Sequence, residues 1–330
     1  MRLLTLSALL PLITTAYPSP SSSAKPLPLL IWHGLGDRHD AEGLHSVGAL
    51  AANIHPGTEV HYIRVADAGP DDQRATFFGN ITAQSEAICA DLAANTNLTD
   101  PATGLVRADA LGFSQGGQFL RGLVERCPVL RVRSLVTFGS QHNGIAEFQR
   151  CGTWDLLCRG AVALVGGNAW TGYVQSHVVP AQYYREVNET TGLPTEGYLE
   201  YSHFLADVNN ERGEKKAEYK KRLAGMEKFV MVVFEDDETV VPKESGWFAE
   251  VNKTSGAVTG LRDRAIYRED WIGLRALDEK GGLVFESVEG GHMELDRKDL
   301  ERTFREYFGA ERESRESGVG GRQQVLKNDL

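Results

Sequence analysis

The chain has 330 residues, of which 42% are hydrophobic and 24% are charged, enough for one large globular domain or two small ones around an ample core. Its formal net charge is −10, and no basic cluster with interleaved aromatic residues occurs. Because an acidic surface repels phosphates, this balance argues against nucleic-acid binding.

The first 25 residues are expected to lie outside the fold. Met1 and Arg2 precede an apolar run from Leu3 to Ile13, followed by small residues, the layout of a secretory signal peptide over residues 1–16. The run is too short to span a bilayer, and no later stretch is long enough. Residues 17–25 are a Ser/Pro linker. We therefore expect a soluble mature protein made in the secretory pathway.

Sequons and cysteines agree with that route. Four N-x-T sequons mark candidate glycosylation sites, at Asn80, Asn97, Asn188 and Asn252. The four cysteines lack a C-x-x-C pair, which argues against zinc or redox chemistry and favours two disulfides. Three connectivities are possible. Sequence neighbours favour a small loop, Cys151–Cys158, and a tie between two helices, Cys89–Cys127.

Strands and helices alternate through the first half of the chain. The apolar runs predict strands at 27–33, 60–65, 107–113 and 132–138, helices at 43–54, 80–95 and 118–126, and a loop at 69–79. This alternation predicts an α/β fold with a mostly parallel, doubly wound sheet. In such sheets ligands bind at the carboxyl ends of the strands, where His33, Ser114 and Gly139 fall.

The pattern changes over about 145–226, where aromatic residues and glycines are scattered without a strong period. We interpret this region as a helical insertion that caps the sheet, with either ordinary helical packing or an apolar groove beneath it. Residues 211–228 are strongly charged and predict a solvated helix. Strands at 229–234 and 283–288 and a helix at 297–308 complete one domain over 26–309. The polar, Gly-rich residues 310–330 are expected to be disordered.

The most informative motif is Gly112-Phe113-Ser114-Gln115-Gly116. Its pattern, G-x-S-x-G, is typical of the nucleophile elbow of α/β-hydrolases. A sharp turn from strand to helix exposes the serine hydroxyl but crowds the positions two before and two after it, so glycine is needed there. A predicted strand precedes the motif and a predicted helix follows it. We therefore interpret Ser114 as the candidate nucleophile rather than part of a plain Gly-rich turn.

A serine nucleophile needs a base, and the base needs an orienting acid. In α/β-hydrolases the chain order is serine, acid, histidine. Of the nine histidines, His292 alone follows the acidic end of strand 229–234, and it lies in a Gly-Gly-His turn. We therefore predict His292 as the base. From position alone the acid is Asp236, Asp237 or Glu238.

An oxyanion hole in this fold uses the backbone N–H after the nucleophile and one from an earlier strand-to-helix loop. Gln115 follows Ser114. The earlier loop is His33-Gly34-Leu35-Gly36, and Leu35 is the predicted donor.

The sequence resembles the palmitoyl-protein thioesterases of the lysosomal type over about residues 26–308. The matching stretches are WHGLGD (32–37), GFSQGGQFLRG (112–122), ERCP (125–128), FLADVNNERG (204–213), KFVMVVFEDDETVVP (228–242) and GLVFESVEGGHMEL (282–295). GFSQGG alone is shared with cytosolic acyl-protein thioesterases and cutinase-like esterases. Many animal relatives carry two adjacent cysteines where this chain has Arg38 and His39.

The resemblance implies a role for each candidate residue. It implies Asp237 as the acid, with Ser114 as nucleophile and His292 as base, and Leu35 and Gln115 as oxyanion donors. It also implies the pairs Cys89–Cys127 and Cys151–Cys158, and a fatty-acyl groove built by residues 141–226. No cofactor or metal is implied, and the oligomeric state stays open.

The activity implied is hydrolysis of long-chain acyl (palmitoyl) thioesters on cysteines of proteins or peptides, through an acyl-serine intermediate. The alternatives are a secreted lipase or carboxylesterase acting on oxyesters, a non-catalytic acyl-chain carrier and, more remotely, a purely structural glycoprotein. The resemblance implies the lysosome or a vacuole, and secretion is an alternative. Residues Lys327–Leu330 match an ER-retrieval tail of the K-D-E-L type at only two of four positions.

Overall fold

The computed structural model describes residues 25–148, 151 and 156–310. The predicted signal peptide, nearly all of the linker, and the tail that ends at Lys327–Leu330 lie outside the described residues. Among the helices of the described part, none has the length and apolar character needed to cross a membrane.

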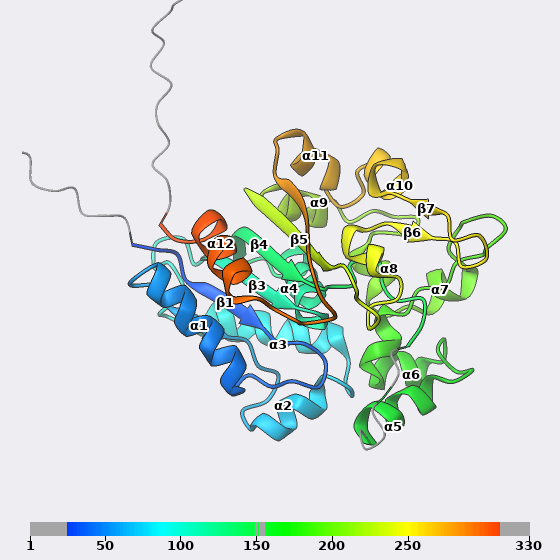
Figure 1. Cartoon of the computed structure of the whole chain (residues 1–330), viewed down its shortest axis with the longest axis horizontal. Coiled ribbons are helices and arrows are strands. Elements are labelled where there is room, and N and C mark those ends of the chain that lie inside the picture. Colours follow the sequence, from blue (N-terminus) through cyan, green and yellow to red (C-terminus); the bar gives the residue numbers. More distant parts are fainter. Residues whose placement is uncertain (1–24, 149–150, 152–155, 311–330) are drawn as a thin grey trace, which may run out of the picture.

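A six-stranded parallel sheet forms the centre of the molecule (Figure 1). Its order is β2-β1-β3-β4-β5-β8, with β2 (Val60–Tyr62), β1 (Leu29–Trp32), β3 (Val106–Phe113), β4 (Leu130–Phe138), β5 (Lys228–Phe234) and β8 (Leu283–Val288). The middle strands are buried along nearly their whole length, which explains their continuous apolar runs. The predicted parallel α/β sheet is confirmed, with each strand end within three residues of the predicted one.

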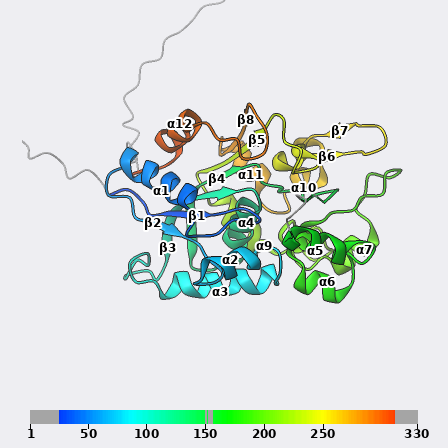
Figure 2. The ribbon, with the colours of Figure 1, turned by 60° about the horizontal axis from the view of Figure 1, so that its bottom comes forward.

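Helices cover both faces of this sheet. Helices α1 (Glu42–Ile54) and α12 (Arg297–Tyr307) lie on one side, and α3 (Ile81–Ala94) lies on the other (Figure 2). Helix α4 (Gln115–Arg126) packs on the same side as α3 and ends before Pro128. Alternate residues of each strand therefore enter two separate cores. Leu29 and Ile31 of β1 pack with α1 and α12, whereas Leu30 and Trp32 pack with α3 and α4.

The predicted loop at 69–79 is wrong in its first part, because residues Gly69–Ala75 form helix α2. Pro70 lies in the first turn, where its missing N–H costs nothing, and Asp71 and Asp72 follow at the positive end of the helix dipole. These features favour a helix start. The apolar periodicity that would reveal a helix is weak because the segment has only seven residues.

The insertion contains short helices, as predicted. They are α5 (Leu156–Val165), α6 (Gly172–His177), the 3-10 helix η1 (Val179–Tyr183), α7 (Glu196–Tyr201) and α8 (Leu205–Val208). The helix predicted over 211–228 is too long, because only α9 (Ala217–Ala224) forms, with Tyr219 and Leu223 buried. The Asn210 side chain bonds both the N–H and the C=O of Lys216, which fixes a turn before the helix begins.

Short elements that the apolar pattern does not predict connect β5 to β8. They are η2 (Lys243–Trp247), the antiparallel pair β6 (Glu250–Val251) and β7 (Val258–Thr259), η3 (Leu261–Asp263), α10 (Ala265–Arg268) and α11 (Leu274–Glu279). Each is two to six residues long, too short for a period to show.

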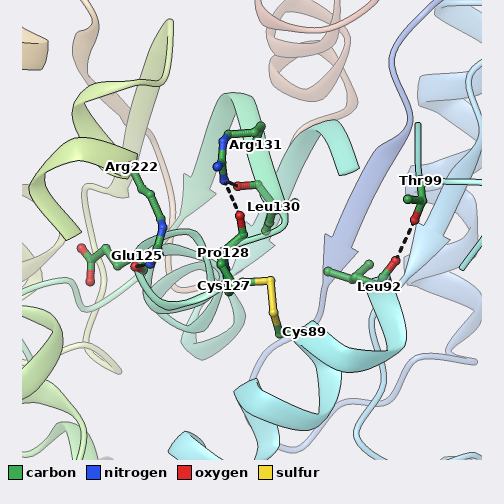
Figure 3. The surroundings of a disulfide bond; sticks show 9 residues. All are labelled: Cys89, Leu92, Thr99, Glu125, Cys127, Pro128, Leu130, Arg131 and Arg222. Carbon is green, nitrogen blue, oxygen red and sulfur yellow. Dashed lines mark hydrogen bonds between the residues drawn. A yellow bond between two sulfur atoms is a disulfide. The ribbon is translucent and has the colours of Figure 1, made fainter. Parts of the chain in front are cut away.

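Two disulfides join the four cysteines. Cys89 of α3 is bonded to Cys127, which directly follows α4 (Figure 3). Around it, Thr99 Oγ1 donates to Leu92 O at 3.3 Å and Arg131 donates to Pro128 O at 2.9 Å. The second disulfide joins Cys151 to Cys158 of α5. These are the two pairs that sequence proximity favours.

Candidate active site

Ser114 lies in the turn between β3 and α4 with φ +50° and ψ −125°, a conformation that residues other than glycine rarely adopt. Two hydrogen bonds hold the turn: Ser114 N donates to Phe138 O at 2.7 Å, and Gly117 N donates to Ser114 O at 3.1 Å. A Cβ atom at Gly116 would overlap the carbonyls of Trp32 and His33. A Cβ atom at Gly112 would overlap the Gly117 backbone. Both glycines are therefore required sterically.

The carboxyl ends of three strands bring Ser114, His292 and Asp237 together. His292 Nε2 lies 2.9 Å from Ser114 Oγ, and His292 Nδ1 lies 2.7 Å from Asp237 Oδ2. Asp237 Oδ1 accepts the N–H groups of Thr239 and Val240 at 2.8 and 3.0 Å, which fixes the carboxylate. The other two candidate acids, Asp236 and Glu238, are exposed. The geometry therefore selects Asp237 from the three acids that position alone left open.

The charge on Asp237 fixes the tautomer of His292. Burial acts to raise the pKa of Asp237, but the hydrogen bond and charge of His292 and the two backbone N–H groups outweigh it and lower that pKa. An ionised carboxylate only accepts, so the proton lies on His292 Nδ1. His292 Nε2 is then free to accept the Ser114 hydroxyl proton, which is the arrangement a general base requires.

The loop after β1 lies against the elbow. Trp32 of β1 is the register partner of Gly112 on the neighbouring strand β3. A Cβ at Gly34 would lie 3.2 Å from Ser114 Cβ. Leu35, the next residue, lines the same cleft as Ser114. Gln115 is the first residue of α4, where backbone N–H groups have no partner within the helix. The two predicted oxyanion donors thus flank Ser114.

An apolar cleft runs from Ser114 beneath the insertion. We call it the insertion cleft; its walls include Phe77, Ile145, Phe148, Val162 and Tyr183. A second cleft reaches Ser114 from the side of α1, and we call it the α1 cleft; its walls include Asp37, Leu44, Val47, His292 and Met293. Leu35, Ser114 and Thr239 line both clefts, so the two meet at the elbow.

The family model described as palmitoyl protein thioesterase matches residues 28–292. The chain belongs to this family. Its parallel sheet, nucleophile elbow and serine–acid–histidine order are those of an α/β-hydrolase. Membership makes the chain an enzyme that hydrolyses thioesters, and the predicted resemblance is confirmed.

Curated relatives agree with the family match. The chain is 32% identical to palmitoyl-protein thioesterase 1 of Caenorhabditis elegans, over 84% of this chain and 90% of that protein. It is 34% identical to the palmitoyl-protein thioesterase-dolichyl pyrophosphate phosphatase fusion 1 of Schizosaccharomyces pombe, over 89% of this chain and 45% of the fusion. A lysosomal thioesterase of Xenopus laevis is 29% identical over 57% of this chain and 62% of that protein.

In this family member, helix α2 braces the loop that carries Leu35, a feature the sequence reasoning missed. Buried Asp72 accepts His33 Nε2–H at 2.8 Å and His39 N–H at 2.9 Å, so it holds the loop at both ends. It also accepts Val65 N–H at 2.7 Å. Burial acts to raise the pKa of Asp72, but His33 and the backbone N–H groups outweigh it and hold that pKa far below its usual range. Within the described ranges, no group of three or more His, Cys, Asp or Glu side chains is placed to hold a metal ion.

Further contacts extend from α2 to both sides of the elbow. Thr76 Oγ1 accepts Gly36 N–H at 2.9 Å, and Gln73 donates to Gly36 O at 2.5 Å. The Gln115 side chain donates to Thr76 O at 3.2 Å and accepts the Tyr183 hydroxyl at 3.0 Å. The α2 segment therefore contacts the neighbourhood of both predicted oxyanion donors. Pro70 followed by two acids was the sequence signal for it.

The four sequon asparagines differ in how available their side chains are. Asn97 and Asn188 are exposed. Asn80 caps α3 by accepting Ala83 N–H. Asn252 donates its Nδ2, the atom to which an N-linked glycan is attached, to Glu189 O at 2.8 Å. The geometry therefore favours Asn97 and Asn188 as acceptors over Asn252.

Proposed function

We propose that this enzyme removes long-chain fatty acyl groups from cysteines of proteins or peptides, with Ser114, His292 and Asp237 as its catalytic residues. The observation that carries the proposal is the hydrogen-bonded chain from Asp237 through His292 to Ser114, placed at the end of an apolar cleft. Family membership supports a thioester as the bond that is cleaved.

Acylation begins when Ser114 Oγ attacks the thioester carbonyl and His292 Nε2 takes the hydroxyl proton. Asp237 holds the imidazole in place and stabilises its positive charge. The N–H groups of Leu35 and Gln115 stabilise the oxyanion, each contributing about 3 kcal/mol in the transition state. The carbon–sulfur bond then breaks, and the proton on His292 passes to the leaving sulfur. Because a cysteine thiol has a pKa of about 8.5, the thiolate leaves more readily than an amine would.

Deacylation reverses these roles. A water molecule gives a proton to His292 Nε2 and attacks the acyl-serine carbonyl, and the ester bond breaks to release the fatty acid. His292 returns the proton to Ser114 Oγ. We assign the acyl chain to the insertion cleft, because Phe77, Ile145, Phe148 and Val162 supply an apolar wall that starts at Ser114.

The direct test is release of palmitate from an S-palmitoyl peptide by the wild type and by Ser114→Ala. We expect the variant to lose about 10⁶-fold in kcat, the order seen when a serine nucleophile is removed. Ser46→Ala, an exposed serine of α1, is the matched control and should keep wild-type activity. Equal rates for wild type and Ser114→Ala would exclude this mechanism. An oxyester of equal chain length, hydrolysed faster than the thioester, would favour a lipase.

We also propose that the chain enters the secretory pathway and acts in the lysosome, in a vacuole or outside the cell. Its two disulfides support an oxidising compartment. The lysosomal name of the Xenopus laevis relative supports an acidic organelle. Enzymatic removal of N-glycans from the expressed protein tests this route. We expect the treatment to increase the gel mobility of the wild type and to leave that of Asn97→Gln/Asn188→Gln unchanged. An unchanged mobility of the wild type would contradict the proposal.

A further inference from the structure

The two clefts at Ser114 lie on different sides of the elbow. The insertion cleft is walled by residues from the cap, such as Phe148 and Val162. The α1 cleft is walled by Leu44 and Val47 of α1 and by Met293 and Leu295, which follow β8. Helix α1 packs on one face of the sheet, and α3 and α4 pack on the other (Figure 2). A substrate whose reacting carbonyl lies at Ser114 therefore has two directions in which to extend.

The position of His292 distinguishes these directions. His292 lines the α1 cleft and is absent from the walls of the insertion cleft. In the mechanism above, His292 Nε2 passes its proton to the leaving sulfur, so that sulfur must lie within hydrogen-bond reach of Nε2. The thiol half of the substrate therefore leaves through the α1 cleft, and the acyl half lies in the insertion cleft.

From this placement we propose that the α1 cleft binds the peptide segment that carries the acylated cysteine, with apolar side chains beside that cysteine. The wall supports this chemistry, because Ala41, Leu44, Val47, Met293 and Leu295 present mainly aliphatic surface. The assignment rests on the proposed function. The α1 cleft would then determine specificity for the protein half of the substrate, as the insertion cleft does for the acyl half.

Gly43 offers a way to fill the α1 cleft without disturbing the fold. It lies on the cleft wall in the first turn of α1 and is exposed. A Cβ built there meets no heavy atom within 4 Å, and its backbone is not in the left-handed region. Gly43→Trp therefore adds an indole at the wall of the cleft without a clash at Cβ, and Gly43→Ala is the matched control for the change in helix propensity.

The experiment compares two thioesters with the same palmitoyl chain. One is an S-palmitoyl peptide with leucines on both sides of the cysteine, and the other is palmitoyl-N-acetylcysteamine, whose leaving group is too short to fill the cleft. For Gly43→Trp we expect KM for the peptide to rise about tenfold and kcat/KM for the small thioester to stay within about twofold, since only the peptide loses apolar contact. Gly43→Ala should raise KM for the peptide far less than Gly43→Trp does, and Ser46→Ala, an exposed position of α1 outside the cleft wall, should match the wild type on both.

A second arm uses the wild type alone, so it does not depend on how a variant folds. Replacing the two leucines of the peptide by serines should raise KM about tenfold, because aliphatic contact with the wall is lost. The assignment is overturned if Gly43→Trp slows both thioesters equally or neither, or if the serine peptide binds as well as the leucine peptide. Failure of the wild type to cleave either thioester would instead contradict the proposed function itself.

Discussion

At the scale of single residues, the turn around Ser114 depends on two neighbours that have no side chain. Gly112 and Gly116 leave room for the backbone of Gly117 and for the carbonyls of the β1 end, so the serine can hold a positive φ. The elbow pattern alone predicts that glycine is needed at both positions. The sequence also points to His292 by chain order, but it leaves three acids open, since all follow the same strand. Burial and two N–H donors distinguish Asp237 from the other two, and neither is visible in a single sequence.

Asp72 gives the first prediction at this scale. Asp72→Asn removes the carboxylate that holds both ends of the Leu35 loop, so an oxyanion donor is misplaced, and kcat for palmitoyl thioester should fall about 10²-fold. Oxyanion donors act mainly in the transition state, so KM should change less than about twofold. Steady-state kinetics check this against Asp71→Asn, an exposed neighbour in α2. A loss confined to KM, or no greater than that of Asp71→Asn, would count against the positioning role.

The lowered pKa of Asp237 gives a prediction for stability against pH. Its folded pKa lies below that of an unfolded aspartate, about 3.9, so its ionisation stabilises the fold fully above that value. This contribution is lost as pH falls through the folded pKa. The difference in free energy of unfolding between wild type and Asp237→Asn should therefore shrink as pH falls below about 4. Urea titrations measure it, with exposed Asp236→Asn as control; a difference that grows with acid would contradict the sign.

At the scale of elements, the central strands are predictable and the short connections are not. Strands such as Leu130–Phe138 and Lys228–Phe234 are buried by helices on both faces, so their apolar runs are continuous. Helix α2, by contrast, has seven residues and is held by tertiary contacts, chiefly those of Asp72 with His33 and His39, which lie 39 and 33 residues away. The residues of α2 and their immediate neighbours do not indicate which distant residues contact Asp72. That is why the brace of the Leu35 loop was missed although Leu35 itself was predicted.

The Cys89–Cys127 disulfide gives a prediction at this scale. It closes a loop 38 residues long between α3 and the end of α4, whereas Cys151–Cys158 closes one of 7. Loop-closure entropy predicts a loss of about 4 kcal/mol for Cys89→Ala/Cys127→Ala and about 2 kcal/mol for Cys151→Ala/Cys158→Ala. Urea unfolding of both double variants checks the order. A larger loss for the shorter loop would show that contacts around the sulfurs, rather than chain entropy, dominate.

At the scale of the whole molecule, the site lies where three layers meet. The sheet supplies Ser114, Asp237 and His292 from its strand ends, residues of the cap line one cleft, and residues of α1 line the other. The sequence predicts the sheet and the existence of a cap. It does not predict that two separate clefts converge on Ser114, because their walls combine residues from distant parts of the chain.

The insertion cleft gives a prediction at this scale. Val162 of α5 lies on its wall, so Val162→Trp should shorten the space available to the acyl chain. We expect kcat/KM for a palmitoyl thioester to fall at least about tenfold, while that for a butyryl thioester of the same thiol changes less than about twofold. The control is Leu164→Trp, because Leu164 lies on the same helix and is 42% exposed. Equal losses for both chain lengths would place the acyl chain elsewhere.

The acyl-enzyme itself offers the most direct measurement. The wild type is mixed with a palmitoyl thioester, quenched in acid during the first turnovers, and digested for mass spectrometry. The account predicts a palmitoyl ester on Ser114 in the wild type, a burst of free thiol that precedes palmitate release, and neither in Ser114→Ala. Turnover without any acyl group on Ser114, or an acyl group on a different residue, would contradict it.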